Sequence, residues 1–391
     1  MTNGRVNYLA IDYFPRYLTY MTQSKQNLIG LSKQQLRELA VSLGEKAFRG
    51  DQMFRWIYHD QVQSIDDMTN ISAAFREILK ENTSITPLAL EQKQVSARDG
   101  TIKFLFNLED GLKIESVLIP PNDVEEISED MRRLTLCIST QIGCPADCKF
   151  CATGTMGFYR NLSVGEIIGQ VIEAQRHAPR RISNIVFMGM GEPMLNYDNV
   201  MNSIDIIGDD EGIGISPRRS TVSTVGYVKK IMQMADEGRK AKLAISLHTL
   251  DDELRTRIMP INRKHNVAEL FDAARYYSMK TRQRVTFEYI FFEGLNDTEK
   301  DIKLIKKLSG KVACKLNIIP FHPIYLPEKS EMKDTFRPPS RGALERFVER
   351  LRSECDFPVM LRSSSGIDID GACGQLAVKE EKATHNNVMT K

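Results

Sequence analysis

Short strand-like runs alternate with amphipathic helical runs along the chain after Arg133, and this alternation constrains the fold most. The apolar runs that we predict as strands are LTLCIST, NIVFMGM, STVSTV, KLAISLH, VTFEYIFF, KLNIIPF and PVMLRS. The clearest helix between them is predicted over 164–177, where Ser163 and Glu166 form a capping box. Repeated strand–helix units predict parallel strands with right-handed crossovers, and therefore an α/β barrel or an open sheet. In such folds, functional residues lie at the carboxyl ends of the strands.

The rest of the chain divides into segments of different character. Residues 1–25 lack periodicity and are predicted to be a poorly defined extension, whereas residues 26–95 are predicted to be a small helical domain. That domain could be a nucleic-acid adaptor or a cap that only packs on its neighbour. Residues 96–130 contain the hairpin pattern TIKFLFNL, EDG, LKIESVLI and then an acidic connection. The alternating region spans residues 131–378, and residues 379–391 are predicted to be a disordered tail.

Composition excludes several classes of protein. The net charge of the 391 residues is only +2, so charge alone does not indicate a nucleic-acid partner. No run of about 18 apolar residues indicates a membrane span, and the N-terminus does not resemble a signal peptide, so we expect a cytoplasmic protein. Seven cysteines are too few for a disulfide scaffold in a chain of this length.

Three of the cysteines lie within eight residues, in the pattern Cys144-x3-Cys148-x2-Cys151, directly after the first predicted strand of the alternating region. A cubane 4Fe–4S cluster normally takes four thiolates, one for each iron. Three thiolates leave one iron open, and the amino and carboxylate groups of S-adenosylmethionine (SAM) can chelate that iron. The alternative is a three-cysteine zinc site that a distant His or Cys completes.

At these residues the chain resembles the radical SAM superfamily. It resembles most closely the dual-specificity rRNA/tRNA adenine-C2 methyltransferases, the RlmN family. The resembling segments are GEKAFRGDQMFRWIYHD, LCISTQIGCPADCKFCATGTMGFYRNL, NIVFMGMGEPMLN, RRSTVSTVG, LAISLHTLDDELR, MPIN and GIDIDGACGQL. The resemblance implies a radical SAM partial (β/α)6 barrel with a small N-terminal helical domain. A sibling family that methylates adenine C8 shares the cluster loop and the GIDID motif, but the N-terminal segment and Pro193 favour the C2 family.

Adenine C2 requires unusual chemistry because it is electron-poor and its hydrogen is hardly acidic. No general base with an ordinary pKa could create a carbanion there, whereas a radical route avoids this problem. The resemblance implies that the reduced cluster cleaves SAM to a 5′-deoxyadenosyl radical and that each turnover consumes two SAM molecules. It implies 23S rRNA and tRNA as substrates, and a flavodoxin or ferredoxin as electron donor. We expect a monomer.

The resemblance also implies three catalytic residues. Cys373 matches the cysteine that first accepts a methyl group, and the methylene radical formed from that group then adds to C2. Cys137 matches the residue that helps to remove the C2 proton and then forms a disulfide with Cys373 to release the product. Glu115 matches a glutamate assigned as proton acceptor, so it competes with Cys137 for one role. Without the resemblance, Cys137 would pass as an inert core cysteine and Glu115 as a solvated strand residue.

The resemblance assigns SAM contacts to residues at or near the ends of predicted strands: Gly191, Glu192, Ser223, Ser246, Leu247, His248 and His322. A glycine permits close backbone approach to a ligand, and a carboxylate can accept hydrogen bonds from the SAM amine or ribose. His322 stands where the family usually has an asparagine, and an imidazole changes its charge with pH.

Two further interpretations stay open from the residues alone. The chain could be a radical SAM enzyme that acts on something other than RNA adenine, or a zinc-stabilised RNA-binding module without catalysis. Arg160, Arg218 and Arg219 flank motif loops and are candidate phosphate contacts, although charged loop residues are usually only solvated.

Overall fold

The computed structural model describes residues 25–121, 133–324 and 335–378. The predictions for the extension (except residue 25), for the acidic connection after Pro121 and for the C-terminal tail therefore lie outside the described residues.

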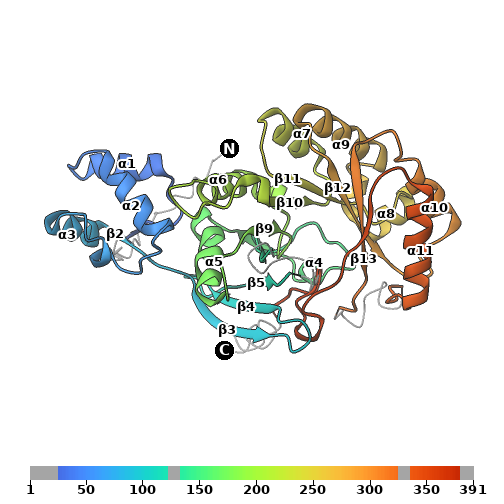
Figure 1. Cartoon of the computed structure of the whole chain (residues 1–391), viewed down its shortest axis with the longest axis horizontal. Helices are drawn as coiled ribbons and strands as arrows, with labels where there is room; N and C mark the ends of the chain where they lie inside the picture. The colour runs from blue at the N-terminus through green and yellow to red at the C-terminus, as the bar shows by residue number, and fades with distance from the viewer. Residues whose placement is uncertain (1–24, 122–132, 325–334, 379–391) are drawn as a thin grey trace, which may run out of the picture.

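A small helical unit forms one end of the molecule (Figure 1), as the sequence predicts. Its helices are α1 (Lys33–Ser42), α2 (Phe48–Tyr58) and α3 (Ala73–Asn82). Ser32 begins α1 with a capping box, in which its hydroxyl accepts a hydrogen bond from the Gln35 N–H. Strands β1 (Gln26–Asn27) and β2 (Thr83–Ser84) pair in parallel and bring the two ends of this unit together.

A ten-stranded sheet forms the body of the molecule, in the order β14-β13-β12-β11-β10-β9-β6-β5-β4-β3. Neighbouring strands from β6 to β14 run parallel, whereas the pairs from β3 to β6 are antiparallel. The strands are β3 (Ala89–Val95), β4 (Ile102–Asn107), β5 (Lys113–Ile119), β6 (Thr135–Cys137), β9 (Asn184–Phe187), β10 (Ser220–Thr224), β11 (Lys242–Ser246), β12 (Val285–Phe291), β13 (Cys314–Pro320) and β14 (Val359–Leu361).

Every predicted strand of the alternating region is present, and the predicted hairpin is the pair β4–β5. The sheet does not close, because β14 and β3 lie at opposite edges. This is the partial barrel that the resemblance implies. Strand β3, which we did not predict, extends the hairpin by one strand and lies within the segment predicted to be helical.

Helices connect the parallel strands and cover one face of the sheet (Figure 1). They are α5 (Val164–His177), α6 (Tyr197–Ile207), α7 (Val228–Asp236), α8 (Asp252–Ile258), α9 (Val267–Thr281), α10 (Glu299–Lys306) and α11 (Arg341–Glu354). The predicted capping box of Ser163 and Glu166 is present at the start of α5. None of the helices in the described part of the chain is long and apolar enough to span a membrane.

The two faces of the parallel sheet differ in character, because successive side chains of a strand point to opposite faces. In β12, Val285, Phe287 and Tyr289 are fully buried in the hydrophobic core. Thr286 and Glu288 alternate with them and are buried on the opposite face. That second face, inside the curve of the sheet, therefore carries polar side chains, and the candidate site lies there.

Candidate active site

The three clustered cysteines lie in a loop that backbone hydrogen bonds hold in place. Antiparallel strands β7 (Gln141–Gly143) and β8 (Phe158–Asn161) flank the loop, and the short helix α4 (Ala152–Thr155) follows it. The Cys144 N–H donates to the Gly157 carbonyl at 2.8 Å, and the Cys151 N–H donates to the Cys148 carbonyl at 3.1 Å. All three side chains line one cavity, here the cysteine-loop cavity.

The donor set of this loop fits an iron–sulfur cluster. Burial raises the pKa of Cys144 to about 12 and also raises the pKa values of Cys148 and Cys151, so bound iron is needed to stabilise thiolates here. Within the described ranges, no three His, Cys, Asp or Glu side chains form a ligand group for one metal ion. A cubane does not require such convergence, because each thiolate binds a different iron.

Gly191 and Glu192 line the same cavity after β9. Gly191 has a φ of +100°, and a Cβ added there would lie 2.5 Å from the Cβ of Gln141, so the turn requires a glycine. The Glu192 carboxylate accepts hydrogen bonds from the N–H groups of Met194 (3.0 Å) and Val225 (2.9 Å). Burial raises the pKa of Glu192 to about 7. An ammonium group that entered the cavity would favour its ionised form.

Three predicted SAM contacts at the ends of β10 and β11 also line this cavity, namely Ser223, Ser246 and His248. Nδ1 of His248 accepts a hydrogen bond from the Ile290 N–H at 3.0 Å, so Nε2 carries the proton. Burial lowers the pKa of His248 to about 3, and the imidazole is therefore neutral at physiological pH. Its ring packs edge-on against Phe150, with 4.7 Å between the ring centroids.

Leu247 and His322 are not among the residues that line this cavity. The Leu247 side chain is fully buried in the hydrophobic core, and its N–H donates to the Glu288 carbonyl. Nε2 of His322 is buried without a hydrogen-bond partner among the described residues, and burial lowers the pKa of the imidazole.

Cys373 joins the cysteine-loop cavity to a second cavity. The second cavity, here the Cys137 cavity, is lined by Cys137, Cys373, Arg133 and Thr135, among others. Arg362 lines both cavities, and the charges of Cys373, Glu288 and Cys137 raise its pKa. Burial raises the pKa of Cys137 to about 12. The disulfide between Cys137 and Cys373 that the resemblance implies is absent, because all seven cysteines are free thiols here.

Glu115 lies on β5 but does not line the Cys137 cavity. It lines a third cavity with Asp368 and Asp370, and its carboxylate pairs with Nζ of Lys103 at 3.1 Å. Burial raises the pKa of Glu115, and Lys103 opposes that shift. The structure therefore brings Cys137 and Cys373 to one cavity and places Glu115 in another.

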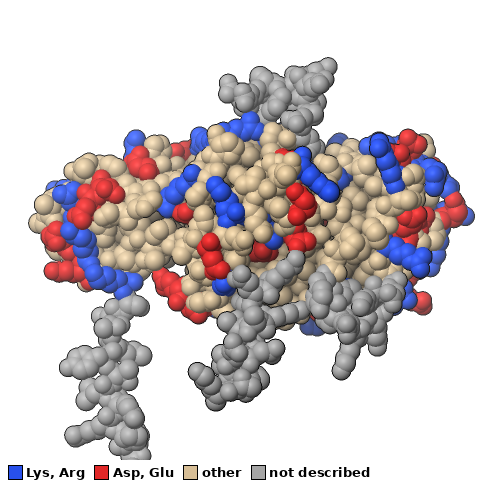
Figure 2. All heavy atoms as spheres, turned by 90° about the horizontal axis from the view of Figure 1, so that it is seen from below, with Lys and Arg blue, Asp and Glu red and all other residues tan. Residues whose placement is uncertain are grey.

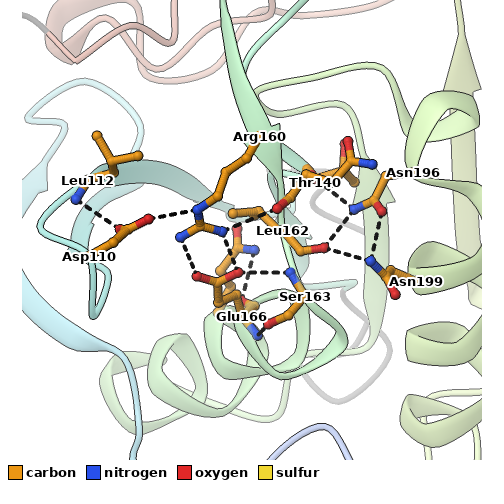
Figure 3. Close-up of polar contacts among 11 residues, drawn as sticks. Asp110, Leu112, Thr140, Arg160, Leu162, Ser163, Glu166, Asn196 and Asn199 are labelled. Atoms are coloured by element: carbon orange, nitrogen blue, oxygen red, sulfur yellow. Dashed lines mark hydrogen bonds and ion pairs between the residues drawn. The ribbon is translucent and has the colours of Figure 1, made fainter. Parts of the chain in front are cut away.

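Arg160 is not a free phosphate contact, because two carboxylates already bind it (Figure 3). Its guanidinium donates to both oxygens of Glu166, at 2.9 and 2.8 Å, and to Asp110 at 2.7 Å. In the same region, the Asn196 side chain donates to the carbonyls of Thr140 (2.9 Å) and Leu162 (2.8 Å). These bonds attach the turn that follows Glu192 to the strands that flank the cysteine loop.

Arg255 is a buried residue beside the cysteine-loop cavity that the sequence did not lead us to expect. It is 1% exposed and donates to the carbonyls of Val225, Ser246 and Leu247. It also donates to Oδ1 of Asn262 at 2.9 Å. The positive charge of Arg255 is close enough to Cys148 to oppose the rise in the pKa of that thiol. Its only sequence signal is its place in the segment LDDELR, one of those that carry the resemblance.

Two family models match this chain. The family model described as the ribosomal RNA large subunit methyltransferase N-terminal domain matches residues 26–85, and the radical SAM superfamily model matches residues 138–305. A probable dual-specificity RNA methyltransferase RlmN of Cytophaga hutchinsonii is 43% identical and covers 95% of this chain and 98% of its own. The corresponding Thermotoga maritima protein is 40% identical over 92% of this chain and 99% of its own.

A solved structure of a radical SAM methyltransferase from Sphaerobacter thermophilus superposes with a TM-score of 0.80 at 38% identity. It covers 90% of this chain and 99% of its own. The fold and the cysteine loop thus define a radical SAM enzyme. With relatives about 40% identical over more than nine-tenths of its length, the chain belongs to the RlmN family of dual-specificity RNA methyltransferases.

Proposed function

We propose that this chain methylates C2 of adenine in 23S rRNA and in tRNA, in the cytoplasm, as a monomer that a flavodoxin or ferredoxin reduces. The observation that carries the proposal is the position of Cys373. This thiol lines both the cysteine-loop cavity and the Cys137 cavity, so one sulfur can exchange groups with ligands in either space. A methyl carrier between a donor site and an acceptor site requires such a position.

Cys144, Cys148 and Cys151 are the residues that would hold the 4Fe–4S cluster. When bound, the cluster supplies the electron that splits the sulfonium of SAM and so provides a carbon radical able to remove a hydrogen atom. The polar residues Glu192, Ser223, Ser246 and His248 would orient SAM, because all of them line the cavity that contains the three cysteines. The neutral His248 can donate from Nε2 without adding a charge.

The Cys373 sulfur would accept the methyl group from one SAM and hold it where a second SAM binds. Arg362 lines both cavities with Cys373, so its positive charge lies beside the sulfur that would accept the methyl group. We assign removal of the C2 proton to Cys137 in preference to Glu115, because Cys137 shares a cavity with Cys373 and Glu115 does not.

Nucleoside mass spectrometry tests the proposal. RNA from a strain that lacks the methylation is incubated with the reconstituted enzyme, SAM and a reductant under anaerobic conditions. We expect 2-methyladenosine with the wild-type enzyme, none with Cys373→Ala, and wild-type yields with the control Cys355→Ala, a partly buried cysteine outside both cavities. Formation of 8-methyladenosine would instead assign the sibling activity, and normal turnover by Cys373→Ala would remove the carrier role.

A further inference from the structure

Four basic residues lie at the N-terminal ends of four parallel strands of the sheet. Arg133 lies two residues before β6 and Arg219 directly precedes β10. Lys242 begins β11, and Lys315 is the second residue of β13. This edge of the sheet is opposite the carboxyl ends of the strands, where the cysteine loop and the predicted SAM contacts lie.

Lys242 and Lys315 belong to strands and lie on the polar face inside the curve of the sheet, and Arg133 and Arg219 lie just before β6 and β10. Side chains two residues apart on a strand share a face. From each cation, steps of two residues reach a residue that lines the cysteine-loop cavity or the Cys137 cavity. The four series are Arg133–Thr135–Cys137, Arg219–Thr221–Ser223, Lys242–Ala244–Ser246 and Lys315–Asn317–Ile319.

The four positive charges act on one another. Besides burial, the charges of Lys315, Arg133 and Arg219 lower the pKa of Lys242. Lys315 also opposes the rise in the pKa of Glu288, a residue of the cysteine-loop cavity. The four cations therefore lie close enough together to act on one another, and Arg133 also lines the Cys137 cavity. We refer to these four residues as the basic rim.

Carboxylates do not neutralise the basic rim within the part of the chain that the structure describes. None of the four side chains has an ion pair or a hydrogen bond to an Asp or Glu there. On the face of the molecule that Figure 2 shows, Lys and Arg are interspersed with Asp and Glu. Cations gathered at one place without acidic partners indicate an anionic ligand.

We propose that the basic rim binds backbone phosphates of the RNA strand that delivers the adenine into the Cys137 cavity. Arg133 belongs to both the rim and that cavity, so a nucleotide whose base reaches Cys373 would place its phosphates among these cations. The RNA thus enters from the N-terminal ends of the strands, while SAM occupies the cavity at the carboxyl ends. The inference rests on the proposed function, because it requires that RNA is the substrate.

The test compares the salt dependence of RNA binding in two double variants, measured by fluorescence anisotropy with labelled tRNA and a labelled rRNA hairpin. Arg219→Gln/Lys242→Gln removes two rim charges. The control Lys229→Gln/Lys303→Gln removes two exposed charges from α7 and α10, on the helical face of the sheet. For the rim variant, the slope of log affinity against log salt should become shallower by about 1.4–1.8, and the affinity should be about tenfold weaker. For the control, the slope should stay within about 0.3 of the wild-type slope.

A slope and an affinity equal to those of the control would overturn the inference. Two further variants separate charge from folding. Arg219→Gln alone should make the slope shallower by about 0.7–0.9. The charge-conserving variant Arg219→Lys/Lys242→Arg should keep the wild-type slope. If the wild-type enzyme produces no methyladenosine, the proposed function fails. If it methylates RNA while the rim variants keep the wild-type slope, only the location of the phosphate contacts is wrong.

Discussion

Replacement of the buried Arg255 by methionine should destabilise the fold around the SAM site. The guanidinium satisfies four acceptors, namely the carbonyls of Val225 (2.8 Å), Ser246 (3.1 Å) and Leu247 (3.3 Å) and Oδ1 of Asn262 (2.9 Å). Methionine has a similar length but donates no hydrogen bond, so three acceptors lose the partner that Arg255 provides, whereas the Leu247 carbonyl keeps a hydrogen bond from the Thr249 N–H.

The magnitude follows from the number of orphaned acceptors. Each buried acceptor left without a partner costs about 1 kcal/mol at the lower end of the usual range, so Arg255→Met, which orphans three acceptors, should lower the free energy of unfolding by about 3 kcal/mol. Arg255→Lys retains a charge and three donors, but an ammonium cannot reach acceptors on separate strands at once. We expect a loss of about 2 kcal/mol for this variant.

Urea unfolding followed by circular dichroism measures both losses. The matched control is Arg275→Met on α9, where the arginine is 59% exposed and pairs with Asp272 at 3.0 Å. This change should alter the free energy of unfolding by no more than about 0.5 kcal/mol. A loss below about 1 kcal/mol for Arg255→Met would show that Arg255 does not join the ends of β10 and β11.

Three further predictions concern the site itself. Gly191→Ala forces a Cβ to within 2.5 Å of the Gln141 Cβ at a φ of +100°, so SAM binding in equilibrium dialysis should weaken at least about tenfold, and unchanged binding would contradict the close approach. Cys137→Ala should leave the RNA covalently attached to the protein, which a denaturing gel shows as a shifted band, and the control Cys355→Ala should give no such band. If Cys137→Ala gives no crosslink, removal of the C2 proton belongs to another group. Burial lowers the pKa of His248 from 6.5 to about 3, so the free energy of unfolding should fall as the pH falls from about 6.5 toward 3. His248→Asn should flatten that dependence, measured by urea unfolding at several pH values. An unchanged dependence would mean that the imidazole does not stay neutral.

Periodicity was sufficient to predict the strands, because each parallel strand is a short apolar run between turn residues. The run VTFEYIFF became β12, which is buried along its whole length. Strand β3 could not be predicted in this way. Its sequence ALEQKQV is mostly polar and exposed, and it forms because β4 offers an unpaired edge, which is a tertiary cause.

Spacing within the chain also predicted that Cys144, Cys148 and Cys151 would share a cavity, since they lie in one short loop. The position of Glu115 depends on a distant segment instead. Glu115 lies two residues before Val117 on β5, and Val117 pairs with Cys137 on β6. Glu115 and Cys137 therefore belong to the same face of the sheet. The C-terminal segment 368–378 crosses that face. It lines the cavity that contains Glu115 as well as the Cys137 cavity, and so it separates Glu115 from Cys137. A contact across more than 200 residues leaves no local pattern.

The central claim is that three cysteines hold a cubane whose fourth iron is open to SAM. Iron and sulfide analysis of the protein purified without oxygen, with electron paramagnetic resonance of the reduced form, tests it most directly. We predict about four iron and four sulfide per chain and a resonance that changes when SAM is added. Loss of the resonance is expected in Cys148→Ala. Bound zinc in place of iron, or a resonance that SAM leaves unchanged, would contradict the account.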